Sequence, residues 1–180
     1  AKTYAYNAIA PRALNRMGMT YLQLGETDKA LEHFDLAVFS YPQWQGVPVA
    51  RVNRLKTLLA MGQNQNVILE GPSLWTVASQ YPKAQMELAI IMADALEKTG
   101  DVERAFLWLD KGFSISQDQQ DREILTQSTL SILNRLNRSD AERILAGNPS
   151  DMTRVFLEFR LAQLEIESGE TEAARNRLIS

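Results

Sequence analysis

The sequence predicts an all-α protein, a right-handed solenoid of about five helical hairpins with no sheet. Three observations predict it: a glycine-centred joint recurs along the chain, amphipathic stretches with helical spacing flank each joint, and the loops between them are short. Hairpins repeated at nearly constant length are typical of a solenoid, in which each unit packs on its neighbours. We therefore expect a single solenoid domain over residues 1–180 and, because the helical pattern continues to the last residues, a longer parent protein.

The recurring joint is centred on Gly25, Gly62, Gly100 and Gly169, at intervals of 37, 38 and 69 residues. The last interval spans about two repeats, and the copy between them, at 137–141, has no glycine. Glycine ends a helix readily because it accepts the positive φ of the position after the C-cap. The Asp, Thr or Glu residues that follow are expected to cap the next helix. Alanine five residues after a glycine leaves room for two helices to cross closely.

Apolar residues at helical spacing place ten helices in order. Leu14, Met17 and Tyr21 recur at i, i+3 and i+7 in the first helix, and the later stretches follow the same rule. The expected helices are 11–24, 28–41, 48–61, 64–80, 83–98, 102–115, 121–136, 139–147, 151–168 and 171–179. We expect the fourth to break at Gly71-Pro72, because proline lacks a backbone donor and clashes with the preceding turn. Residues 1–10 are expected to be the tail of an earlier helix.

Composition argues against several functional classes. The chain has no cysteine and one histidine, His33, so disulfides, thiolate sites and multi-histidine metal sites are excluded. The net charge of −3 gives no general attraction to nucleic acid, and no apolar run approaches the roughly 18 residues of a membrane span. No glycine loop has phosphate-binding spacing. We expect no catalysis, cofactor, metal or nucleic-acid partner, no membrane insertion, and no small-molecule ligand; His33 is expected at the surface.

The repeating unit resembles the tetratricopeptide repeat family. The first unit, residues 11–44, carries the resemblance most closely, and its matching residues are Leu14, Met17, Gly18, Tyr21, Gly25, Ala30, Phe34, Ala37 and Pro42. The unit at 86–119 also fits, whereas 48–82, 121–149 and the stretch from 155 onward are degenerate. The resemblance implies a non-enzymatic scaffold or adaptor. Its protein or peptide partner would lie in a concave groove lined by the first helix of each hairpin.

The resemblance also implies which residues reach that groove, since the family uses positions 2, 5, 9, 12 and 13 of each repeat. The expected partner-binding residues are Arg12, Asn15, Met19, Gln23, Val52, Lys56, Glu87, Ile90, Asp94, Phe156 and Phe159. Apolar and oppositely charged side chains mix along this strip, which suits a peptide and not a polyanion. Family members that clamp a C-terminal carboxylate place Lys and Asn where this chain has Asn15 and Met19, so a carboxylate clamp is not expected.

A weaker resemblance concerns location. Ser40-Tyr41-Pro42 and Gln80-Tyr81-Pro82 each close a helix, as in repeats of bacterial envelope lipoproteins that include outer-membrane assembly factors. The units from Met86 to Leu178 resemble the helical part of penicillin-binding-protein activator lipoproteins. The alternative function is therefore a regulatory module in the bacterial periplasm, acting on peptidoglycan synthesis or outer-membrane assembly through a domain outside this chain. The other interpretation is a cytoplasmic scaffold, and the flanking gene sequence would distinguish it from the periplasmic module.

Overall fold

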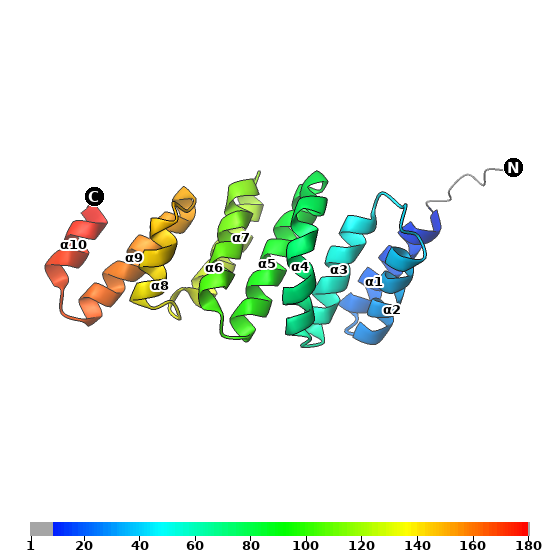
Figure 1. Ribbon diagram of the computed structural model, residues 1–180, viewed down its shortest axis with the longest axis horizontal. Coiled ribbons are helices and arrows are strands. Elements are labelled where there is room, and N and C mark those ends of the chain that lie inside the picture. The colour runs from blue at the N-terminus through cyan, green and yellow to red at the C-terminus, as the bar shows by residue number, and fades with distance from the viewer. Residues whose placement is uncertain (1–8, 180) are drawn as a thin grey trace, which may run out of the picture. The chain divides into compact units, whose positions relative to one another are not determined.

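The computed structural model describes residues 9–179, and within them it contains ten α-helices, one 3₁₀ turn and no strand (Figure 1). The all-α prediction is confirmed. The elements are α1 Ile9–Gln23, α2 Thr27–Phe39, α3 Val47–Ala60, α4 Asn64–Val77, η1 Ala78–Gln80, α5 Pro82–Lys98, α6 Val102–Ile115, α7 Gln119–Leu133, α8 Arg138–Ala146, α9 Asp151–Glu167 and α10 Thr171–Ile179. Most bounds lie within two or three residues of the expected ones. The helix tail expected at 1–10 falls largely outside the described residues, although Ile9 and Ala10 begin α1.

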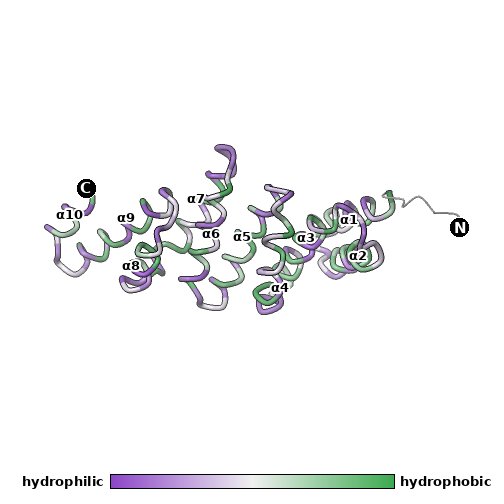
Figure 2. Tube along the Cα trace, turned by 45° about the horizontal axis from the view of Figure 1, so that its top comes forward, coloured by the Kyte–Doolittle hydropathy of each residue, from purple (hydrophilic) through white to green (hydrophobic). Residues whose placement is uncertain are grey.

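The chain forms two compact units, residues 1–91 and 92–180, with the boundary inside α5. In the first unit α1 packs on α2 and α3, α2 on α3, and α3 on α4. In the second, α6 contacts α7, α8 and α9, and α9 also contacts α7, α8 and α10. Apolar and polar residues both recur along the helices (Figure 2), as expected of amphipathic helices that bury one face.

The four predicted glycine joints are confirmed. Gly25, Gly62, Gly100 and Gly169 all adopt positive φ, between 74° and 89°. At the first joint the backbone N–H of Glu26 donates to the carbonyl of Tyr21 at 2.9 Å, and Gly25 N–H donates to Leu22 at 3.1 Å. The same two bonds close α3, α5 and α9. This is the Schellman arrangement, which satisfies carbonyls that the end of a helix leaves unpaired.

The expected caps of the following helices form only in part. Asp101 accepts a hydrogen bond from the backbone N–H of Arg104 at 3.1 Å and caps α6. Glu26 at the start of α2 makes no side-chain cap, and its carboxylate pairs with Lys29 instead. The capping prediction is therefore wrong for α2. Glutamate is one methylene longer than the short polar residues that are preferred at the N-cap.

The predicted break at Gly71-Pro72 is also wrong. Helix α4 runs from Asn64 to Val77 through Pro72. Proline disfavours helical geometry at the preceding residue because its ring clashes with that residue's Cβ, and Gly71 has no Cβ. Gly71 is buried and Pro72 is exposed, so water can pair with the carbonyl that loses its donor. Proline is therefore accommodated on the solvent side of a continuous helix.

The crossing of α1 and α2 is built on a glycine and an aromatic ring. Phe34 is 0% exposed, and Ala30 and Ala37 on the same face of α2 are also fully buried. A Cβ at Gly18 would lie 2.7 Å from Cε1 of Phe34, closer than two carbon atoms can approach. Glycine at this place in α1 therefore lets the Phe34 ring sit directly against the backbone of α1.

The one joint without glycine, between α7 and α8, is closed by a side chain from another helix. Arg160 of α9 is largely buried. Its Nε donates to the carbonyl of Leu136 at 3.0 Å and its Nη2 to the carbonyl of Asn134 at 2.9 Å. Helix α7 itself ends with backbone hydrogen bonds from the N–H of Arg135 to the carbonyl of Ile132 at 3.0 Å and from the N–H of Leu136 to the carbonyl of Leu133 at 3.1 Å. The guanidinium supplies donors to two further carbonyls, those of the C-cap residue Asn134 and of Leu136 in the joint.

The end of the second unit is held by a charged network around Arg177 of α10. Its Nη2 donates to Oε1 of Glu165 at 2.6 Å and its Nη1 to Oε2 of Glu158 at 2.6 Å. Glu165 is a buried carboxylate on α9. The hydrogen bonds from Arg177, opposed by the burial of the carboxylate, hold the pKa of Glu165 below its ordinary value of 4.5. The same hydrogen bonds, which Arg177 donates to Glu165 and Glu158, raise the pKa of Arg177.

We expect this network to make the second unit sensitive to acid. A carboxylate whose pKa is lower in the folded than in the unfolded state stabilises the fold above the unfolded value, and that stabilisation is lost as pH falls through the folded value. The loss begins near pH 4.5 for Glu165 and continues below it. Urea unfolding at about pH 7 and about pH 3.5 should show a smaller acid-induced loss of stability in Glu165→Gln than in the unmodified chain.

The matched control for that measurement is Glu172→Gln, an exposed carboxylate in the first turn of α10. It should keep the acid response of the unmodified chain. If Glu165→Gln loses as much stability in acid as the unmodified chain does, the Arg177 network is not what makes the unit acid-sensitive.

Candidate functional site

The first unit contains an open groove of about 420 Å³ that crosses α1, α3 and the start of α5. These are the first helices of successive hairpins. The lining residues are Met19, Val49, Asn53, Gln80, Tyr81, Pro82, Lys83, Ala84 and Glu87. The groove therefore combines apolar side chains with two amides, a phenol and charges of both signs, within one unit of the chain.

The α1 side of the groove is fixed by an amide pair. Asn53 of α3 is mostly buried, and its Nδ2 donates to Oδ1 of Asn15 on α1 at 3.0 Å. The amide nitrogen of Asn15 lies 4.0 Å from the sulfur of Met19, one turn further along α1. Asn15 is thus held by α3 beside Met19, which lines the groove and is 43% exposed.

The α5 side is held by one ion pair and two hydrogen bonds. Nζ of Lys56 on α3 lies 2.5 Å from Oε1 of Glu87. The Tyr81 hydroxyl donates to the carbonyl of Gln45 at 2.6 Å, and Nε2 of Gln85 donates to the carbonyl of Trp75 at 3.0 Å. The start of α5 is therefore tied to three earlier segments, which gives the groove a fixed wall without covering its apolar side chains.

A comparison with known families identifies the helical hairpin at the start of this groove. Residues 11–42 match the tetratricopeptide repeat model. The first hairpin is a tetratricopeptide repeat. No curated protein and no solved structure matches the chain significantly. Tetratricopeptide repeats in general mediate contacts between proteins and are not themselves catalytic.

Within this repeat and the two hairpins after it, several of the expected binding residues meet. Met19 and Glu87 line the groove, Lys56 pairs with Glu87, and Asn15 holds Asn53. Arg12 and Gln23 are exposed on α1 outside the groove lining. Ile90 is half-buried one turn beyond Glu87 on α5.

Val52 does not fit its expected role, because it is 0% exposed and belongs to the core. The groove side of α3 is instead marked by Val49, Asn53 and Lys56, at i, i+4 and i+7. Asp94, Phe156 and Phe159 belong to the second unit. There Asp94 pairs with Lys98 at 3.0 Å, and the rings of Phe156 and Phe113 lie 6.0 Å apart. Phe159 is exposed.

Sequence reasoning missed Asn53 and the segment at 80–84. Asn53 was detectable as a polar residue one turn after Val49, between the apolar residues Val52 and Leu55 of the same helix. The segment at 80–84 runs from the end of η1 into the first turn of α5. Its place depends on tertiary contacts such as the hydrogen bond from Tyr81 to Gln45. Local periodicity carries no information on such contacts.

The described residues contain no cluster of three or more His, Asp or Glu side chains suited to a metal ion. In the same part of the chain, none of the helices has the length and apolar content to cross a bilayer. His33, expected at the surface, is half-buried, with its ring 5.0 Å from that of Tyr21 and its Nδ1 2.7 Å from the Lys29 carbonyl.

Proposed function

We propose that this chain is a non-enzymatic interaction scaffold that binds a peptide or an extended protein segment in the groove of α1, α3 and α5. The observation that carries the proposal is that one continuous groove crosses the first helices of three successive hairpins, beginning in the tetratricopeptide repeat. Its volume of about 420 Å³ falls in the range of sites that accept a few ligand side chains.

The chemistry of the lining supports a peptide with at least one apolar anchor. Met19, Val49 and Ala84 offer apolar contact, and methionine adapts to side chains of different shapes. Asn53 and Glu87 supply polar atoms beside these contacts, and peptide backbones need such partners when they lose water. The mixed charge of Lys56 and Glu87 disfavours a polyanion as the ligand.

The test begins with a random peptide library selected on the unmodified chain, followed by fluorescence polarisation with the selected peptides. Met19→Glu should weaken their binding at least tenfold, a difference of about 1.4 kcal/mol, because it places a charge on the apolar wall. Met17→Glu is the matched control, since Met17 lies on the same helix with 45% exposure but does not line the groove. It should change affinity by less than about twofold.

A charge-swapped variant tests the other wall. Lys56→Glu with Glu87→Lys keeps the ion pair but exchanges its two ends, so the melting temperature should stay nearly unchanged, because exposed pairs contribute little to stability. Peptides that contact either end should bind more weakly to this variant. If peptides bind Met19→Glu, the swapped variant and the unmodified chain equally well, the groove is not the binding site.

A further inference from the structure

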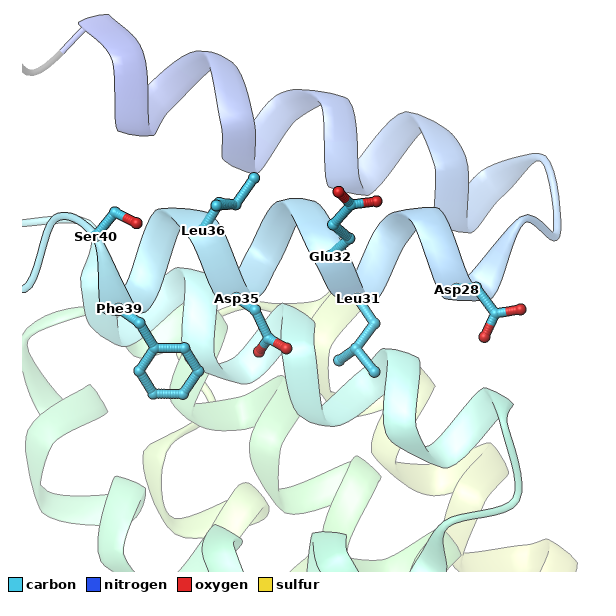
Figure 3. A pocket seen from close by; sticks show the side chains of 7 residues that line it. All are labelled: Asp28, Leu31, Glu32, Asp35, Leu36, Phe39 and Ser40. Carbon is cyan, nitrogen blue, oxygen red and sulfur yellow. The ribbon is translucent and has the colours of Figure 1, made fainter.

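Helix α2 carries a second surface that the groove does not use. Six side chains of α2, together with Ser40, line an open depression of about 480 Å³ (Figure 3). We call this surface the α2 face, and its members are Asp28, Leu31, Glu32, Asp35, Leu36 and Phe39. Leu31, Asp35 and Phe39 project in one row along the helix, and Glu32 and Leu36 in another. Each row therefore combines acidic and apolar side chains.

The packing of the unit does not account for these apolar residues. Helix α2 buries a different set, Ala30, Phe34, Ala37 and Val38. Phe39 nevertheless is 68% exposed and Leu36 is also exposed. An exposed phenylalanine and leucine one turn apart, rimmed by carboxylates, form the kind of patch that marks a contact site for another molecule.

The carboxylates of the α2 face favour a cationic partner. Asp28 and Glu32 form no ion pair among the residues that the structure describes, and the nearby cation Lys29 pairs with Glu26 instead. The two carboxylates are one turn apart, so their charges add along the helix. A partner with lysine or arginine at matching spacing would gain complementary charge along the whole face.

One guanidinium of this chain, that of Arg54, already contacts the α2 face. Nε of Arg54 on α3 lies 2.5 Å from Oδ1 of Asp35, and its guanidinium carbon is 5.8 Å from the centre of the Phe39 ring. Arg54 also pairs with Glu70 at 2.8 Å. A carboxylate beside an exposed ring is thus already used to hold one arginine, and Asp28 and Glu32 continue the acidic series toward the start of α2.

We propose that the α2 face docks a basic amphipathic helix, with Leu31, Leu36 and Phe39 contacting its apolar stripe and Asp28 and Glu32 its flanking lysine or arginine residues. A helix laid along α2 matches the spacing of three to four residues at which the acidic and apolar side chains recur. This surface is separate from the groove of α1, α3 and α5, so both can be occupied by different partners.

The probe is a synthetic peptide of about 14 residues with leucine at i, i+3, i+4 and i+7 and lysine elsewhere, compared with its leucine–glutamate counterpart. The lysine peptide should bind and the glutamate peptide should not. Asp28→Lys with Glu32→Lys should weaken binding of the lysine peptide at least tenfold, and Phe39→Gln at least threefold.

The matched control makes the same change of charge at two carboxylates outside the α2 face, by Glu142→Lys together with Glu172→Lys. Glu172 lies in the first turn of α10, as Asp28 does in α2, and Glu142 is exposed on α8. This control pair should change affinity by less than twofold. Equal losses in both pairs would mean general charge attraction and would overturn the proposal, as would equal binding of the glutamate peptide.

Two further measurements test whether the lysine peptide binds in the groove instead, and whether the α2 face binds a second copy of the chain. Met19→Glu in the groove should leave binding of the lysine peptide unchanged, so loss of binding in Met19→Glu alone would place the peptide in the groove and overturn the proposal. Sedimentation velocity should give the same species for the unmodified chain and for Phe39→Gln. If Phe39→Gln dissociates a dimer, the face binds a second copy of the chain and the basic-helix proposal is wrong.

Discussion

Phe34→Ala is expected to lower the free energy of unfolding of the first unit by about 3–5 kcal/mol. The ring is fully buried and lies against Gly18, where no side chain exists to move into the space that the ring would leave. A cavity between two helices then remains, and cavities add to the loss of apolar burial. Urea unfolding of the full chain, with hydrogen exchange of the α1 and α2 amides to assign the transition, measures the effect.

Phe39→Ala is the control for this measurement, because it removes the same ring from the same helix at a position that is 68% exposed. It should lower the free energy of unfolding by about 1 kcal/mol or less, chiefly through the lost contact with Arg54. Equal losses in Phe34→Ala and Phe39→Ala would mean that the α1–α2 crossing does not depend on the ring against Gly18.

The parts of the fold that sequence predicted well are set by local backbone chemistry. Each joint glycine adopts a conformation that other residues rarely accept, so Gly25, Gly62, Gly100 and Gly169 fixed the hairpins before any tertiary contact was known. Helical spacing of apolar residues then gave the type and order of the helices. The close match of the first hairpin to a tetratricopeptide repeat has the same origin, since its key positions are all local.

The features that were wrongly predicted from the sequence depend on neighbouring residues and on how a helix packs. Pro72 was expected to break α4, but the helix continues through it, and the glycine before it removes the clash of the proline ring with a preceding Cβ. Val52 was placed in the groove by its repeat position, whereas Val49 and Asn53 line the groove and Val52 is buried in the core. Val52 and Asn53 are about 100° apart around the helix, so the repeat position identified the correct turn of α3 but not the side chain that reaches the groove.

The joint between α7 and α8 is the clearest case in which a tertiary contact, and not the local sequence, determines how a joint is stabilised. Without glycine, no residue after Leu133 in this joint adopts positive φ, and only one of the two Schellman bonds forms, from the N–H of Arg135 to the carbonyl of Ile132. The group that binds the carbonyls of the joint, Arg160, comes from α9, more than twenty residues later. Nothing in the local sequence at 134–137 shows that this arginine is aimed at it.

Arg160→Met is therefore expected to destabilise the second unit by about 3 kcal/mol, although methionine keeps most of the aliphatic volume of arginine. The substitution removes two charge-assisted hydrogen bonds and leaves the carbonyls of Asn134 and Leu136 without their donor. Because Leu136 is fully buried, water reaches that end of the joint poorly. Arg160→Lys should recover only part of the loss, since an ammonium lacks the planar pair of donors that reaches both carbonyls.

Arg175→Met, on the exposed side of α10, is the control and should change the free energy of unfolding by less than about 0.5 kcal/mol. Urea unfolding measures the three variants, and hydrogen exchange of the α7 and α8 amides localises the effect. Local opening should rise at the α7–α8 joint in Arg160→Met and stay unchanged in Arg175→Met. Stability in Arg160→Met equal to that of the unmodified chain would mean that the joint closes without the arginine, and the account of the missing glycine would then be wrong.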